Sequence, residues 1–186
     1  MDFEKLIVAV VKILDTLKIP YAITGGYAVS VWGRPRSTFD VDVIIEFPHS
    51  KVHALALALK RISELTYIDE HMMMRAVDRK GEFNFIHIES GIKVDFFVLK
   101  DEPFSALRLK RRIAKSIGGK KVFFLSSEDL ILSKLLWSKD TESELQLRDV
   151  ASIMKFQKKL DWRYLQKWAK IHATAKTLTS LRKKHA

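Results

Sequence analysis

The sequence predicts an α+β fold in which helices flank a small mixed or antiparallel sheet and a helical C-terminal region follows. Up to residue 125, short β-prone runs alternate with turn residues and helical segments, whereas from residue 126 onward apolar residues recur at helical spacing. The chain has 186 residues, 47% of them hydrophobic, so it can bury a sizeable core. We therefore expect a core of residues 1–125 with the helical residues 126–186 packed on it.

The first expected element is an amphipathic helix, because "FEKLIVAVVKILDTL" carries apolar residues three and four positions apart. Asp2 and Glu4 stand where a secretory leader has positive charge, and no apolar run is long enough to span a bilayer. The chain has no cysteine, which excludes a disulfide framework and thiolate metal sites. These observations predict a cytoplasmic protein without a membrane partner.

The strands are expected where β-branched and aromatic residues form short runs bounded by turn residues. The runs are 21–24, 39–47, 83–89, 92–99 and 120–125. Ser90 and Gly91 suit a tight hairpin between two of them, and residues 72–77 are a candidate edge strand. Helices are expected between the strands, over residues 27–32, 49–65 and 103–117.

Three helices are expected after residue 125, in "SSEDLILSKLLWSK", "ESELQLRDVASIMKF" and "DWRYLQKWAKIHA". Ser126 precedes Asp129 by three residues and an apolar run follows, which resembles a capping box. Asp161 is placed to cap the last of these helices.

Asp40 and Asp42 stand in a strand that otherwise reads Val, Val, Ile, Ile. Residues two apart in a strand share a face, so the two carboxylates point to the same side and repel each other. A divalent cation would remove that repulsion, and Mg²⁺ or Mn²⁺ prefers carboxylate oxygen ligands. A calcium loop is disfavoured, because the surrounding residues form a strand and not a polar loop.

Asp95 lies in a second apolar strand, "IKVDFFVL", where a buried unpaired carboxylate would be costly. If the two strands are neighbours, Asp95 joins the pair. Three carboxylates can hold two metal ions about 3.5–4 Å apart, the arrangement used for displacement at phosphorus. An ion pair of Asp95 with Lys93 or Arg75 is the structural alternative.

Gly25 and Gly26 follow the first expected strand and precede a short helix. Glycines at such a turn let backbone amides approach a phosphate closely, although a plain turn is the simpler explanation of the pair alone. Arg34, Arg36 and Thr38 add donors for a nucleoside triphosphate.

The net charge of +11 is uneven along the chain. Residues 1–103 carry 13 basic against 15 acidic side chains, whereas residues 104–186 carry 20 against 7. A basic half favours a polyanionic partner such as RNA, although a solvated helical surface also explains it. The first candidates for RNA contact form one basic cluster: Lys110, Arg111, Arg112 and Lys115.

The stretch "GGYAVSVWGRPRSTFDVDV" resembles the first motif of the DNA polymerase β-type nucleotidyltransferase superfamily. Its Arg-x-Thr-x-Asp-x-Asp form is similar to the nucleotidyltransferase toxins of abortive-infection type toxin–antitoxin systems, although Gly26 replaces the serine of the common superfamily turn. The segment "EDLILSKLLWSKDTESELQLRDVASIM" resembles a later segment of that branch. By this resemblance Lys134 contacts nucleotide phosphates and Asp149 organises the site.

The resemblance implies Mg²⁺-dependent transfer of a nucleoside monophosphate from an NTP, such as ATP, to an acceptor. Asp40, Asp42 and Asp95 would be the catalytic metal ligands, with Asp95 assisting deprotonation of the acceptor. RNA, tRNA in particular, is the favoured acceptor, and a cognate antitoxin protein is a possible partner. The alternatives are a non-catalytic nucleotide- or RNA-binding module and a chain whose main contact is a partner protein.

Overall fold

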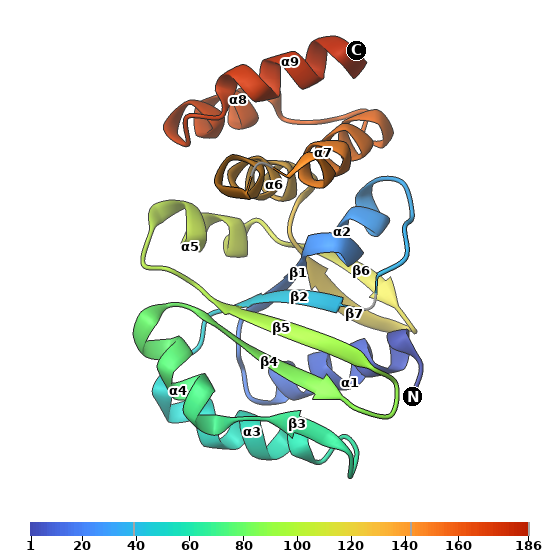
Figure 1. The fold of residues 1–186 in the computed structure, drawn as a ribbon, viewed down its shortest axis with the longest axis vertical. Helices are drawn as coiled ribbons and strands as arrows, with labels where there is room; N and C mark the ends of the chain where they lie inside the picture. The colour runs from blue at the N-terminus through green and yellow to red at the C-terminus, as the bar shows by residue number, and fades with distance from the viewer. Residues whose placement is uncertain (39, 142, 186) are drawn as a thin grey trace.

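The computed structural model describes residues 1–38, 40–141 and 143–185, and these form a mixed sheet with helices on both faces (Figure 1). In the described residues the sheet has seven strands in the order β3-β4-β5-β2-β1-β7-β6. The strands are β1 (Tyr21–Thr24), β2 (Asp40–Ile45), β3 (Thr66–Ile68), β4 (Glu82–His87), β5 (Ile92–Val98), β6 (Ile113–Ile117) and β7 (Lys120–Phe124). This architecture confirms the fold class predicted from the sequence.

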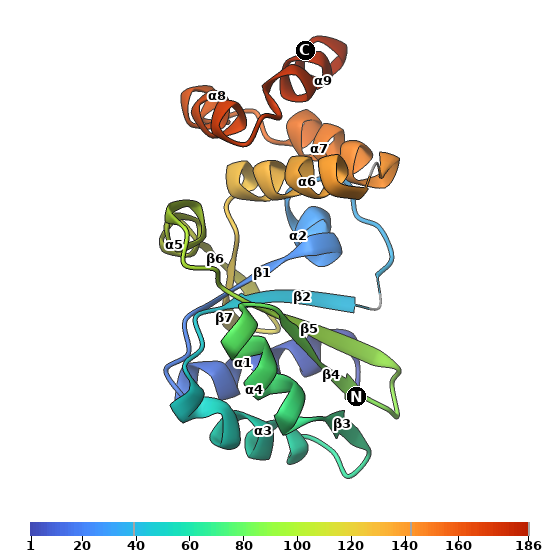
Figure 2. The same ribbon diagram turned by 60° about the vertical axis from the view of Figure 1, so that its left-hand side comes forward.

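Helices form two layers, one on each face of the sheet. Figures 1 and 2 show α1, α3 and α4 under one face, α2 and α6 over the other, and α7, α8 and α9 further out. The helices are α1 (Phe3–Thr16), α2 (Gly25–Trp32), α3 (Val52–Lys60), α4 (Glu70–Arg79), α5 (Pro103–Lys110), α6 (Ser127–Thr141), α7 (Glu144–Phe156), α8 (Trp162–Ile171) and α9 (Ala175–His185). In the described residues, none of them is long and apolar enough to cross a membrane.

Helix α6 is buried between the sheet side of the molecule and the outer helices. Leu130, Ile131, Leu132 and Leu135 have no exposed surface, and the polar Asp129, Ser133 and Lys134 of the same helix are buried as well. Ser126 caps the helix as expected, because its hydroxyl accepts a hydrogen bond from the Asp129 backbone N–H at 3.1 Å. The position of α6 brings the buried Lys134 near Asp42 of β2.

The register of β2 sets the geometry of the site. Strand β2 runs parallel to β5 and antiparallel to β1, so it is a central strand of the sheet. Asp42 lies opposite Asp95 of β5, and Asp40 lies opposite Lys93. On its other side Asp42 lies opposite Thr24, the residue before Gly25. The register therefore places the Asp-x-Asp strand, the third aspartate and the glycine turn next to one another.

Three segments differ from the sequence expectation: residues 72–77, 103–117 and 49–65. Residues 72–77 were expected as an edge strand but belong to α4, whose N-terminus Asp69 caps by accepting from the His71 and Met72 amides. The buried residues of α4 fall at helical spacing, and three consecutive methionines mask that period. The edge strand is instead β3.

The helix expected over 103–117 ends at Lys110, and Ile113–Ile117 is strand β6. Gly118 and Gly119 both have positive φ, at 51° and 74°, and they turn β6 back onto β7 as a hairpin. The helix expected over 49–65 is a short 3₁₀ turn followed by α3, which ends at Lys60. Two ends of expected elements, Phe39 and Glu142, lie outside the described residues.

Candidate active site

A cavity of about 410 Å³ lies between the exposed faces of β2 and β5 and the helices α6 and α7. It brings together residues from four parts of the chain that are far apart in sequence. The lining residues are Gly26, Arg36, Thr38, Asp40, Asp42, Phe97, Lys134, Trp137, Thr141 and Gln146. Its volume is in the range of small-molecule sites, which start at about 300 Å³.

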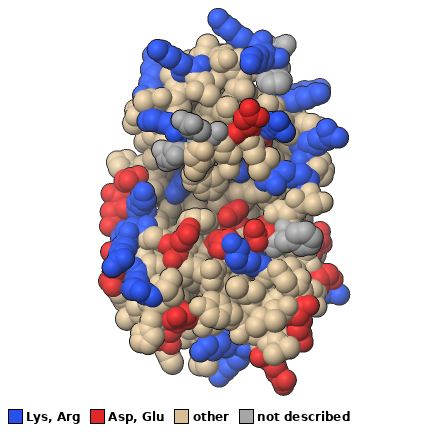
Figure 3. All heavy atoms as spheres, viewed as in Figure 1, with Lys and Arg blue, Asp and Glu red and all other residues tan. Residues whose placement is uncertain are grey.

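The three predicted carboxylates share one face of the sheet beside this cavity. Asp42 and Asp95 are half-buried and opposite each other, and Asp40 is exposed at the strand end. Burial, and then the Asp95 carboxylate, raise the pKa of Asp42 above its usual value, while Lys134 and the Gly26 amide act in the other direction. Figure 3 shows acidic side chains gathered along the hollow between the sheet and the helical part.

Asp95 is paired with a lysine of its own strand. The Lys93 ammonium lies 2.8 Å from the Asp95 Oδ2. This is one of the two ion pairs that the sequence analysis named as the structural explanation of Asp95. This hydrogen bond raises the pKa of Lys93. Over residues 1–38, 40–141 and 143–185, no three acidic or histidine side chains converge closely enough to hold a metal ion. The carboxylates therefore share a face, but Lys93 already neutralises one of them.

Gly25 and Gly26 are required at the start of α2. Gly25 has a φ of +63°, and a Cβ there would overlap the Asp42 carboxylate. A Cβ on Gly26 would lie 2.8 Å from Arg36 Nη2 and 3.3 Å from Thr38 Oγ1. The turn thus places the backbone of the helix N-terminus directly against a carboxylate, a guanidinium and a hydroxyl. A side chain is excluded at Gly25, whereas at Gly26 it would require the end of the Arg36 side chain to shift.

Lys134 and Asp149 form a buried ion pair with Arg36. The Lys134 Nζ lies 2.9 Å from Asp149 Oδ2, and the Arg36 Nε lies 3.3 Å from Asp149 Oδ1. The side chains of Lys134 and Asp149 are only 3% and 4% exposed. Lys134 is therefore not a surface lysine of an amphipathic helix, and Asp149 pairs with neither Arg148 nor Lys139. Arg148 pairs with Glu144 instead.

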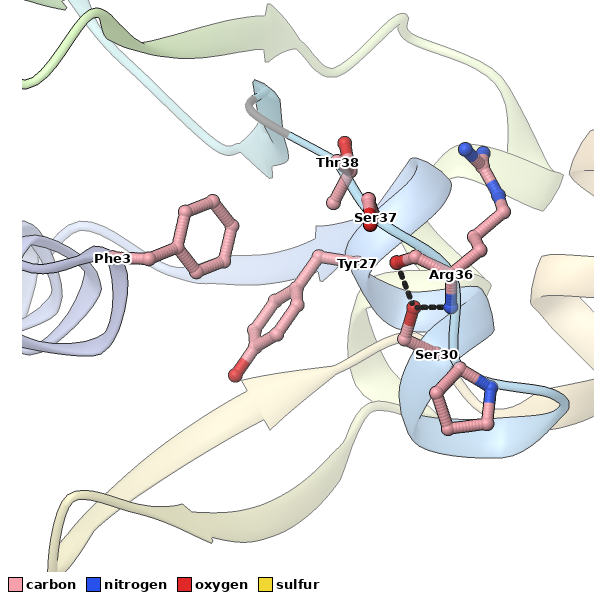
Figure 4. A pocket seen from close by; sticks show the side chains of 7 residues that line it. Phe3, Tyr27, Ser30, Arg36, Ser37 and Thr38 are labelled. Carbon is pink, nitrogen blue, oxygen red and sulfur yellow. Dashed lines mark hydrogen bonds between the residues drawn. The ribbon is translucent and has the colours of Figure 1, made fainter.

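The loop that carries Arg36 and Thr38 also borders a second cavity of about 390 Å³ (Figure 4). Ser30 holds this loop, since its Oγ donates to the Arg36 carbonyl and accepts from the Arg36 backbone N–H. Phe3 and Tyr27 lie on one side of that cavity with ring centroids 5.1 Å apart, and the Arg36 guanidinium points away from them. The loop thus directs Arg36 towards Asp149 and the first cavity.

Arg34 is separated from the other predicted nucleotide-binding residues. It is exposed, its backbone N–H donates to Ser152 Oγ at 2.7 Å, and it lines a further cavity of about 780 Å³ beside α7. Arg36 and Asp149 border that cavity too, so the ion pair lies between two hollows.

The four predicted RNA contacts do not lie on one helix, because α5 ends at Lys110 and Lys115 belongs to β6. Lys110 ends α5 and is exposed, whereas Lys115 lies on β6 with its ammonium 4.2 Å from the centroid of the Trp32 ring. Arg111 binds the fully buried Asp129 at 3.3 Å and stacks on Tyr164. Arg112 donates to the Leu109 carbonyl at 2.8 Å and stacks on Phe123. Both arginines therefore have structural contacts.

The sequence analysis named Lys93 only as an ion-pair partner of Asp95, and it assigned no role to four further side chains of the site: Phe97, Trp137, Thr141 and Gln146. Their spacing from predicted site residues could have indicated that they share a face with those residues. Lys93 and Phe97 flank Asp95 at intervals of two on a strand, so they share its face. Trp137 follows Lys134 by three residues and Gln146 precedes Asp149 by three, so each pair shares a helix face.

No protein-family model matches the chain, and no curated protein matches it in sequence. Solved structures do match. An antigenic nucleotidyltransferase-like protein from Paracoccidioides brasiliensis is 22% identical, with a TM-score of 0.56 over 95% of this chain and 91% of that one. A lincomycin-bound lincosamide antibiotic adenylyltransferase is 15% identical, with a TM-score of 0.56 over 84% of this chain and 98% of that one.

A third similar structure is ANT(2″)-Ia in complex with adenylyl-2″-tobramycin, 15% identical, with a TM-score of 0.55 over 98% of both chains. At these identities the likeness shows the fold, and the fold is that of nucleotidyltransferases. The three structures do not include a toxin of the abortive-infection type, which the sequence had suggested.

Proposed function

We propose that this protein transfers a nucleoside monophosphate from an NTP to an acceptor, with divalent metal ions as cofactors. The observation that carries the proposal is the placement of Asp42 and Asp95 opposite each other on parallel central strands, with Asp40 on the same face and the Gly25–Gly26 turn against Asp42. Clustered carboxylates destabilise a fold unless a ligand uses them, so their grouping favours a catalytic role over a non-catalytic binding module.

The residues present fit a metal ion by the chemistry of their donors. Asp40, Asp42 and Asp95 offer carboxylate oxygens, which Mg²⁺ and Mn²⁺ prefer. Burial, and then the Asp95 carboxylate, raise the pKa of Asp42, and a bound cation would offset both effects. Asp95 would have to exchange its bond with Lys93 for the metal. When bound, the metal ions would polarise the α-phosphate and neutralise the leaving pyrophosphate.

The chain's own residues would position the substrates. The amides at the N-terminus of α2 would bind phosphate oxygens, with Lys134 and Arg36 as cationic contacts and Thr38 as a hydroxyl donor. An acceptor hydroxyl would attack the α-phosphorus, and the bond to the pyrophosphate oxygen would break. The hydroxyl proton would pass to the Asp95 carboxylate, which lies on the same face as Asp42.

The test of this activity is incubation with each NTP labelled at the α-phosphate, Mg²⁺ and candidate acceptors. We expect label to join an acceptor with wild-type protein and not with Asp42→Asn. Asp101→Asn is the matched control, because Asp101 is an exposed carboxylate paired with Lys80. Pyrophosphate release provides a second readout that needs no knowledge of the acceptor. Equal release by wild type and Asp42→Asn would refute the proposal.

RNA, and tRNA in particular, is the acceptor that the charge distribution favours. The helical part shows mainly Lys and Arg on the face seen in Figure 3. The cavity of about 780 Å³ borders the site through Arg36 and is lined also by Arg34, Arg148 and Lys155. A single strand could follow these cations to the carboxylates. Labelling of total RNA, lost on mild RNase treatment, would support this acceptor.

A small molecule with a hydroxyl group is the second candidate acceptor. It is favoured because two similar structures are named for adenylyl transfer to antibiotics and superpose over 84% and 98% of this chain. The acidic hollow would suit a cationic acceptor better than a polyanion (Figure 3). Label in an aminoglycoside or lincosamide, and none in RNA, would decide for this class.

Co-purification of a second protein from the native host would support the antitoxin partner.

A further inference from the structure

We propose that Trp137 and Gln146 form a nucleobase subsite that selects adenine, so that the donor nucleotide is ATP. This inference rests on the proposed function, because it assigns the base of the NTP whose phosphates the glycine turn would bind. It starts from three lining residues of the 410 Å³ cavity that have no part in the proposed metal and phosphate binding, namely Phe97, Trp137 and Gln146.

Two of these three side chains are aromatic. Trp137 of α6 and Phe97 of β5 lie with ring centroids 6.3 Å apart and planes inclined by 43°. Both side chains are half-buried, so part of each ring faces the cavity. Stacking of a base on an aromatic ring stabilises nucleotide binding and requires only an open ring face. The two inclined rings therefore offer an apolar corner for a flat ligand.

Lys134 links this aromatic corner to Gly26 and Arg36, the residues proposed to bind the phosphates. Its ammonium lies 5.3 Å from the centroid of the Trp137 ring and also binds Asp149, which holds Arg36 next to Gly26. A nucleotide whose phosphates lie at Gly26 and Arg36 would pass Lys134 before its base reached Trp137. The order of these contacts matches the order of groups in an NTP.

Gln146 supplies the polar contact in the corner. Its Oε1 is buried and has no hydrogen-bond partner among the described residues. Leaving a buried acceptor unpaired destabilises a fold, and most such atoms in folded proteins are paired. Gln146 lines the same cavity as Trp137, and rotation of its terminal amide would turn the unpaired Oε1 towards a ligand there, which would supply the missing donor.

The donor that fits is an exocyclic amino group beside a ring nitrogen. A glutamine side chain accepts from the adenine N6 amino group through Oε1 and donates to the adjacent ring nitrogen through Nε2, a pairing typical of adenine recognition. Cytosine also has an amino group beside an acceptor ring nitrogen. Guanine has one too, at N2 and N3, but this edge lies beside the ribose and is less accessible to a side chain than the N6 edge of adenine. Adenine is favoured over cytosine because the larger purine covers more of the two rings.

Equilibrium binding of ATP, GTP, CTP and UTP to the full chain with Mg²⁺ tests the subsite without acceptor or turnover. We expect wild type to bind ATP at least tenfold more tightly than GTP. Gln146→Met, which keeps length and removes both polar atoms, should lose most of this preference. Gln166→Met on the exposed surface of α8 is the matched control and should keep it. Trp137→Leu should weaken all four nucleotides together.

A ligand-side arm keeps the test valid even if Gln146→Met folds poorly. Purine riboside triphosphate lacks the N6 amino group, so wild type should bind it as weakly as Gln146→Met binds ATP. The variant should not distinguish the two ligands. Binding of ATP and purine riboside triphosphate with equal affinity by wild type would overturn the adenine assignment. Tighter binding of CTP or GTP than of ATP would overturn it as well.

The failure of this inference is distinguishable from failure of the proposed function. If wild type binds no NTP, the nucleotidyltransferase proposal fails. If wild type binds NTPs and loses binding in Gly25→Ala, but Gln146→Met leaves all affinities unchanged, only the base subsite fails.

Discussion

Replacing Asp42 by asparagine should make the metal-free protein more stable. Asp42 lies opposite Asp95 in register, shares a face with Asp40 and is half-buried. Its raised pKa reflects burial and this repulsion. Asparagine keeps the shape and one acceptor oxygen, so it removes the charge with little change in packing. The variant therefore separates the electrostatic penalty of the site from its structure.

The size of the gain follows from the sheet geometry. Adjacent strands lie about 4.8 Å apart, and two unit charges at about 5 Å repel by roughly 3 kcal/mol at an effective dielectric constant of about 20. Lys93 and Lys134 offset part of this repulsion. We expect a net gain of about 1 kcal/mol, which raises the melting temperature of a chain of this size by about 2–4 °C.

The stability gained by Asp42→Asn should depend on pH. The folded pKa of Asp42 lies above its unfolded value of 3.8, so the stability of wild type falls as pH rises through that interval. The gain of Asp42→Asn should therefore be complete near neutral pH and shrink as pH falls towards 3.8. Differential scanning fluorimetry in EDTA across pH measures it, with Asp101→Asn as control. A variant that melts below wild type near neutral pH would refute the reasoning.

Four further outcomes follow from the structure. Lys93→Met should raise the affinity for Mn²⁺ in the absence of nucleotide, measured by calorimetry, because the Lys93 ammonium competes for Asp95. Gly25→Ala should abolish NTP binding and lower the melting temperature, since its Cβ overlaps the carboxylate of Asp42. Asp149→Asn should cost about 3–5 kcal/mol in urea unfolding, because it leaves the buried ammonium of Lys134 without a counter-ion. Lys110→Gln should flatten the salt dependence of RNA binding by about 0.7 in log–log slope if this exposed lysine contacts a single strand.

The strands and the turn of the site could be predicted because their signals are local. Gly25, Asp40 and Asp42 lie within one short stretch, and alternation along a strand fixes which residues share a face. Asp95 could be added because a carboxylate among apolar strand residues requires an explanation. The direct register of Asp42 with Asp95 could not be derived, since strand order depends on the whole sheet.

The segments that were predicted wrongly are those whose structure depends on packing or pairing with other parts of the chain. In 72–77 a run of methionines is equally compatible with helix and strand, and only the Asp69 cap and the packing of α4 decide. In residues 111–117 the basic residues suggested a continued helix, but the turn at Gly118 and Gly119 pairs this segment with β7. The four basic residues expected on one helix therefore lie on different elements, because Lys115 belongs to strand β6 whereas Lys110 ends helix α5.

The charges of the site divide into two groups with different roles. Asp40, Asp42 and Asp95 lie on one face of the sheet, where Lys93 pairs with Asp95 and Lys134 acts on Asp42, so the carboxylates outnumber the cations beside them. Lys134 and Arg36 share the single buried carboxylate of Asp149, so the second group carries excess positive charge. A metal ion suits the first group and a phosphate chain suits the second. Asp40 and Asp42 of the first group and Arg36 and Lys134 of the second line one cavity. A bound metal would neutralise the carboxylates and bound phosphates would neutralise the cations, and the attraction between metal and phosphates favours joint binding of metal and nucleotide.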